Sequence, residues 1–424
     1  KLPRAIINKW LQILSTNTKP EVTQNGGKIA EFPGVRAPYV TEMKFLNETS
    51  YDPIPIYRVI DNNGEVIDSK EEPNIDKDEL VYMYKSMVQL SQMDKVLYES
   101  QRQGRISFYM TNYGEEGIHI GSAAALSPDD LVFAQYREVG VFLYRGVTVT
   151  ELINQCYGNH EDPGKGRQMP VHYGSKQRNM ITISSPLATQ MPQAVGAAYA
   201  LKRAHRDACA VCYFGDGAAS EGDAHAAFNF AATLDCPVIF LCRNNGYAIS
   251  TPTSEQYRGD GIGARGPAFG IRTVRVDGTD ALAVYRAVKQ AREIAVGQQK
   301  PVLVEAMSYR VGHHSTSDDS SAYRSLEEIQ KWTNDESPIQ KFKLYLERKG
   351  FWNDEADQAW QKECRNNVVR TMQEAEKKKK PNWKEMLEDV YYVMPPRLQK
   401  QMQQMEKHLA KHKEHYPMDQ YQSD

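Results

Sequence analysis

The sequence of 424 residues has little net charge and lacks any long apolar run. Its 52 Lys and Arg against 54 Asp and Glu give a formal net charge of -2. No global electrostatic attraction to nucleic acid or to an anionic membrane surface is therefore expected. No apolar stretch approaches the roughly 20 residues that a membrane-spanning helix requires. We expect a soluble protein that binds neither nucleic acid nor a membrane.

Cysteine is also scarce, with six scattered along the chain. Most lie in apolar segments, which is typical of free buried thiols in a reducing compartment. Cys209 and Cys212 have the spacing of a redox motif, but strand positions three apart face opposite sides of a sheet, so we predict two core residues. The chain begins at Lys1 without an initiator methionine or an apolar signal core. We expect any targeting segment to have been removed or left out of this sequence.

The pattern along the chain predicts three segments. Residues 1–75 are punctuated by proline and asparagine and are expected to form an extended arm that includes a β-hairpin turning at Gly64. Residues 76–320 open with a long amphipathic helix and then alternate short apolar runs with helical ones, which is typical of an α/β domain with a doubly wound parallel sheet. Residues 321–424 are charged and helical. We predict a C-terminal helical extension there.

The strongest functional signal is Gly215-Asp216-Gly217 at the end of the apolar run 208–214, followed by a helical stretch, a second apolar run and Asn244-Asn245. This order predicts a β-α-β unit, in which ligands collect at the carboxyl ends of the strands. Asp216 and an asparagine amide would then lie at the same sheet edge. Carboxylate and amide oxygens suit Mg²⁺, which keeps some positions for phosphate oxygens. The alternative interpretation is two unrelated surface turns.

Further polar residues follow other predicted strands. Arg137, in Gln135-Tyr136-Arg137, could contact phosphate in a bidentate manner. Arg310 and the pair His313-His314 begin a loop after the apolar run that ends at Met307, where they could hold a diphosphate or move protons. By contrast, Gly261–Gly266 fits a dinucleotide-binding glycine string, but no strand precedes it, so we predict a loop.

The spacing from Gly215 to Asn245 resembles the thiamine diphosphate-binding motif. Two further stretches, Asn245–Pro252 and above all His313–Ser325, resemble the alpha subunit of the branched-chain 2-oxo acid dehydrogenase, over residues from about 30 to His415-Tyr416-Pro417. The resemblance implies the thiamine diphosphate-binding fold. It also implies oxidative decarboxylation of branched-chain 2-oxo acids in the mitochondrial matrix, with acylation of a lipoyl group.

The resemblance also implies roles for individual residues. Mg²⁺ would be held by Asp216, the Asn245 side chain and the Tyr247 carbonyl. Animal members of the family have Glu in place of Asp216, so the ligand here would reach one methylene less. His314, Arg310 and Ser185 would be catalytic, with His314 transferring protons. The remaining sets are the thiamine diphosphate contacts Tyr136, Arg137, Ser185, Gly217, Ala218, Arg243 and His314, and the K⁺ ligands Ser184, Pro186, Thr189 and Gln190.

The active site is expected to be shared between chains. Thiamine diphosphate needs a carboxylate beside its aminopyrimidine ring, and the segments flanking the central domain are too short to supply a second domain that carries it. The family supplies it from a beta subunit in an alpha2beta2 tetramer. The tetramer acts with a lipoyl-bearing acyltransferase core and is controlled by a kinase and a phosphatase. Ser315 and Ser325 match the family's phosphorylation sites, and a phosphate at Ser315 would repel the cofactor's diphosphate.

Two other interpretations stay open on the sequence. A pyruvate dehydrogenase-type alpha subunit would differ in the size of its substrate pocket. The pair His313-His314 favours the branched-chain type, since the pyruvate type carries a single histidine there. A non-catalytic regulatory subunit would keep the fold without binding cofactor, and the intact set of metal ligands argues against it.

Overall fold

The computed structural model describes residues 29–388 and 390–423, and the chain divides into two compact units, residues 1–52 and 53–424. In the first unit, β1 (Ile29–Phe32) and β2 (Val35–Pro38) pair as an antiparallel hairpin. The first 28 residues of the predicted arm lie outside the described residues. Residues 53–75 belong to the second unit, in which β3 (Ile56–Tyr57) pairs with the main sheet.

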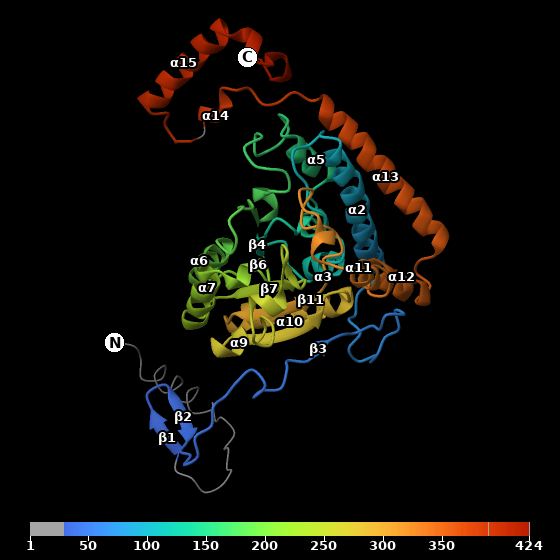
Figure 1. The fold of residues 1–424 in the computed structure, drawn as a ribbon, viewed down its shortest axis with the longest axis vertical. Coiled ribbons are helices and arrows are strands. Elements are labelled where there is room, and N and C mark those ends of the chain that lie inside the picture. The colour runs from blue at the N-terminus through green and yellow to red at the C-terminus, as the bar shows by residue number, and fades with distance from the viewer. Residues whose placement is uncertain (1–28, 389, 424) are drawn as a thin grey trace. The chain divides into compact units, whose positions relative to one another are not determined.

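The second unit is built on a seven-stranded sheet whose order is β3-β10-β11-β7-β6-β4-β5 (Figure 1). All neighbouring strands in it are parallel. The other members of the sheet are β4 (Leu131–Phe133), β5 (Met180–Ile181), β6 (Ala210–Gly215), β7 (Val238–Asn244), β10 (Arg272–Asp277) and β11 (Val302–Met307). A small antiparallel pair is formed by β8 (Tyr247–Ala248) and β9 (Thr251–Pro252). The prediction of a doubly wound α/β fold is confirmed.

Helices cover both faces of this sheet, and its central strands are therefore buried on both sides. Side chains that alternate along β6 and β7 belong to two separate apolar cores, one shared with α6 and α7 and the other with α3, α4 and α10. Cys209 lies in one core and Cys212 in the other, as their spacing predicts. All six cysteines are free and buried. Figure 1 shows α6 and α7 together beside β6.

The helical elements are bounded as follows. The long helix α2 (Lys77–Arg102) begins at the N-cap Asp76, whose side chain accepts a hydrogen bond from the Glu79 backbone. The remaining helices are α3 (Glu116–Ala124), α4 (Val139–Tyr144), α5 (Val149–Tyr157), α6 (Gln190–Arg203), α7 (Gly222–Thr233), α8 (Thr253–Gln256), α9 (Arg265–Ala268), α10 (Ala281–Gln298), α11 (Leu326–Asn334), α12 (Pro338–Arg348), α13 (Asp354–Lys377), α14 (Glu385–Glu388) and α15 (Pro396–Lys411). None of the helices within the described residues is both long and apolar enough to cross a membrane.

The predicted turn at Gly64 forms. Gly64 has φ +72°, the left-handed conformation that glycine adopts without strain, and a Cβ there would lie 2.4 Å from the Tyr345 backbone nitrogen. The flanking strands are shorter than predicted, with a single antiparallel bridge between Ile60 and Val66. Ile56 and Tyr57 instead extend the parallel sheet beside β10.

Candidate active site

A cavity of about 240 Å³ opens where four neighbouring strands, β4, β6, β7 and β11, end at their carboxyl edge. This edge is where ligands bind in open parallel sheets, because successive strands deliver their following loops to one crevice. The cavity is lined by Gln135, Tyr136, Arg137, Leu187, Gly215, Asp216, Gly217, Ala218, Glu221, Arg243, Asn245, Tyr247, Ala248, Ile249, Arg310 and His314. Of the residues predicted to bind Mg²⁺ or the cofactor, all except Ser185 are in this set.

Asp216 and Asn245 lie side by side. Burial raises the pKa of Asp216 to about 6, while the nearby Asn245 backbone N–H acts in the opposite direction. Gln256 Nε2 donates to Asp216 Oδ2 at 3.3 Å. The Asn245 side-chain amide donates to Glu115 Oε1 at 2.7 Å. The amide oxygen of Asn245, Oδ1, accepts a hydrogen bond from the Tyr247 backbone N–H at 3.2 Å. A buried carboxylate beside an amide oxygen is a donor set for a hard cation, and a cation there would offset the cost of burying the charged carboxylate.

Gly217 lets the backbone after β6 approach the loop after β7. A Cβ at this position would lie 2.9 Å from the Cβ of Ala248, closer than side-chain carbons pack. The Gly215 backbone N–H is fixed from the other side by the Gln135 side chain, at 2.9 Å from Oε1. The Gly-Asp-Gly turn is thus held against both neighbouring loops.

Two buried carboxylates, which no sequence motif indicates, hold the cavity-lining residues Arg243 and Asn245. Glu115 accepts from Arg243 Nη1 at 2.8 Å as well as from Asn245, and Glu138 accepts from Arg243 Nε. Both acids are fully buried. The only sequence signal for Glu115 was a pair of acids flanked by glycines, Gly114-Glu115-Glu116-Gly117, with no strand before it.

Arg137 and Arg310 add positive charge to the lining of the cavity. Arg137 Nη2 donates to the His314 carbonyl at 2.8 Å, and the Arg310 guanidinium donates to the Ile249 carbonyl, also at 2.8 Å. His314 Nδ1 lies 3.4 Å from both guanidinium groups. Burial, reinforced by Arg137 and Arg310, lowers the pKa of His314 to about 3. The imidazole is therefore neutral at physiological pH.

The segment after β11 is tied to the rest of the unit on both sides of His314. The His314 backbone N–H donates to Asp318 Oδ2 at 2.8 Å, and the Thr316 backbone N–H donates to the Tyr109 carbonyl at 3.1 Å. Ser315 lies between these anchors and is only 8% exposed. Ser325 is exposed, and its Oγ accepts from the Glu328 N–H as the N-cap of α11. Of the two predicted phosphorylation sites, Ser315 is thus buried and Ser325 is exposed to solvent.

Ser185 lies outside the cavity set. It is exposed, and its Oγ is 2.7 Å from His172 Nε2. The neighbouring residues proposed for potassium form a loop before α6, in which Thr189 Oγ1 donates to the Pro186 carbonyl at 3.2 Å and Gln190 Nε2 donates to the Tyr213 carbonyl at 2.9 Å. Ser184 is exposed.

The glycine string at Gly261–Gly266 is a loop, as predicted, and it surrounds a carboxylate of the chain itself. The backbone N–H groups of Ile262 and Gly263 donate to the two oxygens of Glu305, at 2.7 and 2.9 Å. Glu305 is buried on β11 and also accepts from Arg275 at 2.8 Å. This loop is therefore a structural feature and not a nucleotide cradle.

The cavity fits a diphosphate held through a divalent cation. Oxygen donors for the cation and the guanidinium groups of Arg137 and Arg310 line the same cavity. Within the described part of the chain, the buried Nε of Arg310 has no hydrogen-bond partner, so one donor remains for a ligand. The fold and this site together define a doubly wound α/β protein whose sheet has, at its carboxyl edge, a cavity suited to a phosphorylated cofactor.

Comparison with known proteins narrows this class. The model of the dehydrogenase E1 component family matches residues 84–384. The chain is 57% identical over 392 residues to the mitochondrial 2-oxoisovalerate dehydrogenase subunit alpha of Mus musculus, covering 92% of this chain and 89% of the relative. The corresponding protein of Homo sapiens is 58% identical over 391 residues, covering 92% and 88%. That of Caenorhabditis elegans is 58% identical over 384 residues, covering 90% and 89%.

The chain belongs to the dehydrogenase E1 component family and, within it, to the alpha subunits of 2-oxoisovalerate dehydrogenase. This family depends on thiamine diphosphate. The expectation of a branched-chain 2-oxo acid dehydrogenase subunit is confirmed.

Proposed function

We propose that this chain acts in the mitochondrial matrix as the alpha half of an alpha2beta2 enzyme. The enzyme decarboxylates branched-chain 2-oxo acids and passes the acyl group to a lipoyl arm of an acyltransferase core. The observation that carries the proposal is that Asp216 and Asn245 follow neighbouring strands and line one cavity together with Arg137, Arg310 and His314. When bound, thiamine diphosphate supplies the carbon nucleophile and the electron sink of decarboxylation.

In this proposal Mg²⁺ is held by Asp216, the Asn245 Oδ1 and the Tyr247 carbonyl. Arg137 and Arg243 lie around the diphosphate, and the narrow Gly217-Ala218 turn lets backbone approach it. Glu115 holds the Asn245 amide so that its oxygen, and not its nitrogen, faces the cation. Potassium is assigned to the loop of Ser184, Pro186, Thr189 and Gln190, where it would order the chain before α6.

His314 is proposed as the proton-transfer group. Because its pKa is lowered to about 3, it is a neutral imidazole that can accept a proton from a reacting group, and its position between two guanidinium groups disfavours a persistent imidazolium. Arg310 is fixed by Ile249 and Tyr323 and would bind the carboxylate of the 2-oxo acid. Ser185 is not needed for this arrangement.

The chain alone offers half of the catalytic groups. The carboxylate that acts on the aminopyrimidine ring is assigned to the beta subunit, which agrees with the cavity lying open at the sheet edge. A kinase and a phosphatase are proposed to act on the segment 313–325, which contains both Ser315 and Ser325.

The function is tested by co-expressing the chain with its beta subunit and comparing decarboxylation of 3-methyl-2-oxobutanoate and pyruvate, with thiamine diphosphate and Mg²⁺ present. We expect kcat/KM for the branched substrate to exceed that for pyruvate by at least about tenfold, a difference of ~1.4 kcal/mol in transition-state binding. An Asp216→Asn variant should lose Mg²⁺-dependent cofactor binding in calorimetry. Preference for pyruvate would contradict the substrate assignment. Cofactor binding that is unchanged in Asp216→Asn would contradict the metal site.

A further inference from the structure

The C-terminal end of α15 carries a cluster of histidines that has no part in the site at the sheet edge. His408 and His412 are four residues apart on the last turns of the helix, with ring centroids 4.7 Å apart. His412, Glu414 and His415 each offer a ligand atom, and these atoms lie within 4.8 Å of one another. The sequence His408-Leu409-Ala410-Lys411-His412-Lys413-Glu414-His415 thus brings three imidazoles and one carboxylate to one place.

We propose that this cluster is a binding site for a borderline transition-metal ion such as Zn²⁺. Imidazole nitrogen with a carboxylate oxygen is the donor set of tetrahedral zinc sites, and histidines four apart on a helix face the same side. A cation is also favoured at the C-terminal end of a helix, where the last carbonyl groups carry partial negative charge. Ca²⁺ and Mg²⁺ prefer oxygen ligands and are not expected to compete.

The cluster is already close to the required geometry. The His415 backbone N–H donates to the His412 carbonyl at 3.0 Å, so the chain turns back onto the end of the helix. His412 and His415 rings are nearly parallel, with centroids 6.3 Å apart. Side-chain rotation can then bring both imidazoles to a common ion, since His415 and Glu414 are exposed and already lie 3.5 Å apart, between His415 Nε2 and Glu414 Oε1. His408 can supply the fourth ligand or remain bonded to the Tyr416 hydroxyl, 2.9 Å from its Nε2.

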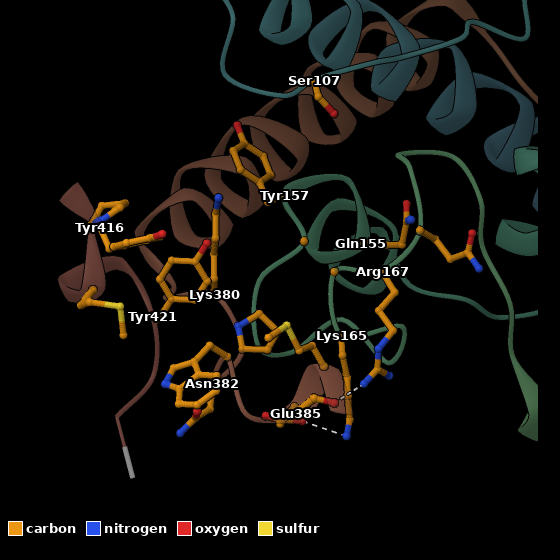
Figure 2. Close-up of a pocket in the computed structure, with 18 of the residues that line it drawn as sticks. Ser107, Gln155, Tyr157, Lys165, Arg167, Lys380, Asn382, Glu385, Tyr416 and Tyr421 are labelled. Carbon is orange, nitrogen blue, oxygen red and sulfur yellow. Dashed lines mark hydrogen bonds and ion pairs between the residues drawn. The ribbon is translucent and has the colours of Figure 1, made fainter. Parts of the chain in front are cut away.

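A metal here would fix the chain that follows. Tyr416, Met418 and Tyr421 line a second cavity of about 470 Å³, with Trp383 from the C-terminal segment and Tyr157 from α5. Figure 2 shows Tyr416 and Tyr421 near Lys380 on one side of this cavity, and Lys165 and Arg167 reaching Glu385 on the other. The strand-like contact of Lys380 with Tyr421 is a single bridge. Binding at the histidine cluster would therefore add a metal-coordinated anchor to a weakly paired segment.

The test is zinc titration of the full chain assembled with its beta subunit, free of any polyhistidine tag and stripped of metal beforehand. We expect isothermal calorimetry with ZnCl₂ alone to show one site per alpha chain that weakens at least tenfold in His412→Gln/His415→Gln. A control, His205→Asn/His225→Gln, changes two exposed histidines elsewhere and should bind zinc as the unmodified protein does. Equal zinc binding by the unmodified chain and His412→Gln/His415→Gln would overturn the proposal, as would the absence of a site in the unmodified chain.

A second measurement separates a specific site from loose association. Trypsin cleaves after lysine, and Lys411 and Lys413 flank His412, so zinc should slow cleavage there in the unmodified chain and in the control but not in His412→Gln/His415→Gln. Zinc that protects all three proteins equally would also overturn the proposal. The variants change exposed side chains far from the catalytic groups in sequence and contact, so decarboxylase activity serves as the check that they fold.

Discussion

Glu115 links the proposed metal ligand Asn245 to Arg243 in the active site. Its carboxylate accepts from Asn245 Nδ2 at 2.7 Å and from Arg243 Nη1 at 2.8 Å, with no exposed surface. Replacing it with Gln puts an amide N–H where an acceptor stands. Either Arg243 loses a partner, or the Asn245 amide rotates and turns its nitrogen toward the metal.

We therefore expect Glu115→Gln to weaken Mg²⁺ and thiamine diphosphate binding by about tenfold or more, equivalent to at least ~1.4 kcal/mol. Binding is measured as the cofactor concentration that gives half-maximal activity, and directly by calorimetry. Glu116→Gln is the matched control, because Glu116 is the adjacent buried acid and contacts the Gly114 backbone instead of Arg243 or Asn245. Equal effects of the two substitutions would refute a specific role for Glu115.

The residues of the site divide by whether the local sequence marks them as functional. Asp216, Asn245 and Arg137 could be predicted because each directly follows an apolar run, and parallel strands bring such positions to one edge. Glu115 and Glu138 could not, since a buried acid is identified only by the partner that neutralises it, here Arg243. The pairing depends on tertiary contacts that the local sequence does not encode.

At the scale of elements, two serines of the segment between β11 and α11, Ser315 and Ser325, have different physical constraints. Ser315 is buried between anchors to Asp318 and Tyr109, whereas Ser325 is exposed and caps α11. A negative charge at Ser315 must be placed in a confined, partly apolar space beside the diphosphate site. A negative charge at an N-cap is stabilised by the helix dipole.

Ser315→Asp should consequently lower overall activity with the beta subunit and lipoyl acceptor by at least about tenfold, because it forces residues 313–316 away from Tyr109. Ser325→Asp should keep activity within about threefold, since Asp is itself a good N-cap. Both variants are measured at saturating thiamine diphosphate, and hydrogen exchange of residues 311–318 reports the loop directly. Full activity in Ser315→Asp would exclude this mechanism of regulation.

The elements themselves differ in how well the sequence predicts them. The helix after Asp76 and the buried strands β6 and β7 follow from apolar periodicity and caps. The hairpin around Gly64 was overpredicted in length, because Ile56 and Tyr57 gain a parallel neighbour, β10, that lies more than two hundred residues away in the chain. Such distant pairing overrides local propensity.

At the scale of the whole molecule, several buried acids make stability depend on pH. Burial raises the pKa of Glu116 to about 8 and that of Asp94 to about 7. The folded chain thus holds protons on these groups at pH values where the unfolded chain has released them. Because the folded state binds more protons between the unfolded pKa and the folded one, raising the pH through this window lowers the free energy of unfolding.

A glutamine at position 116 cannot ionise and keeps an acceptor for the Gly114 N–H, which Glu116 binds at 2.9 Å. Glu116→Gln should therefore gain stability relative to the unmodified chain as pH rises from 5 to 8, by on the order of 1–3 kcal/mol at the upper end. Denaturant unfolding of both proteins at pH 5 and pH 8 measures this change in the free energy of unfolding. The control is Glu374→Gln, at an exposed position on α13. Its free energy of unfolding should differ from that of the unmodified chain by the same amount at both pH values. The prediction is contradicted if the free energies of unfolding of Glu116→Gln and the unmodified chain differ by the same amount at pH 5 and pH 8. Glu116 would then be ionised in the folded protein, with Gly114 and its neighbours compensating for its burial.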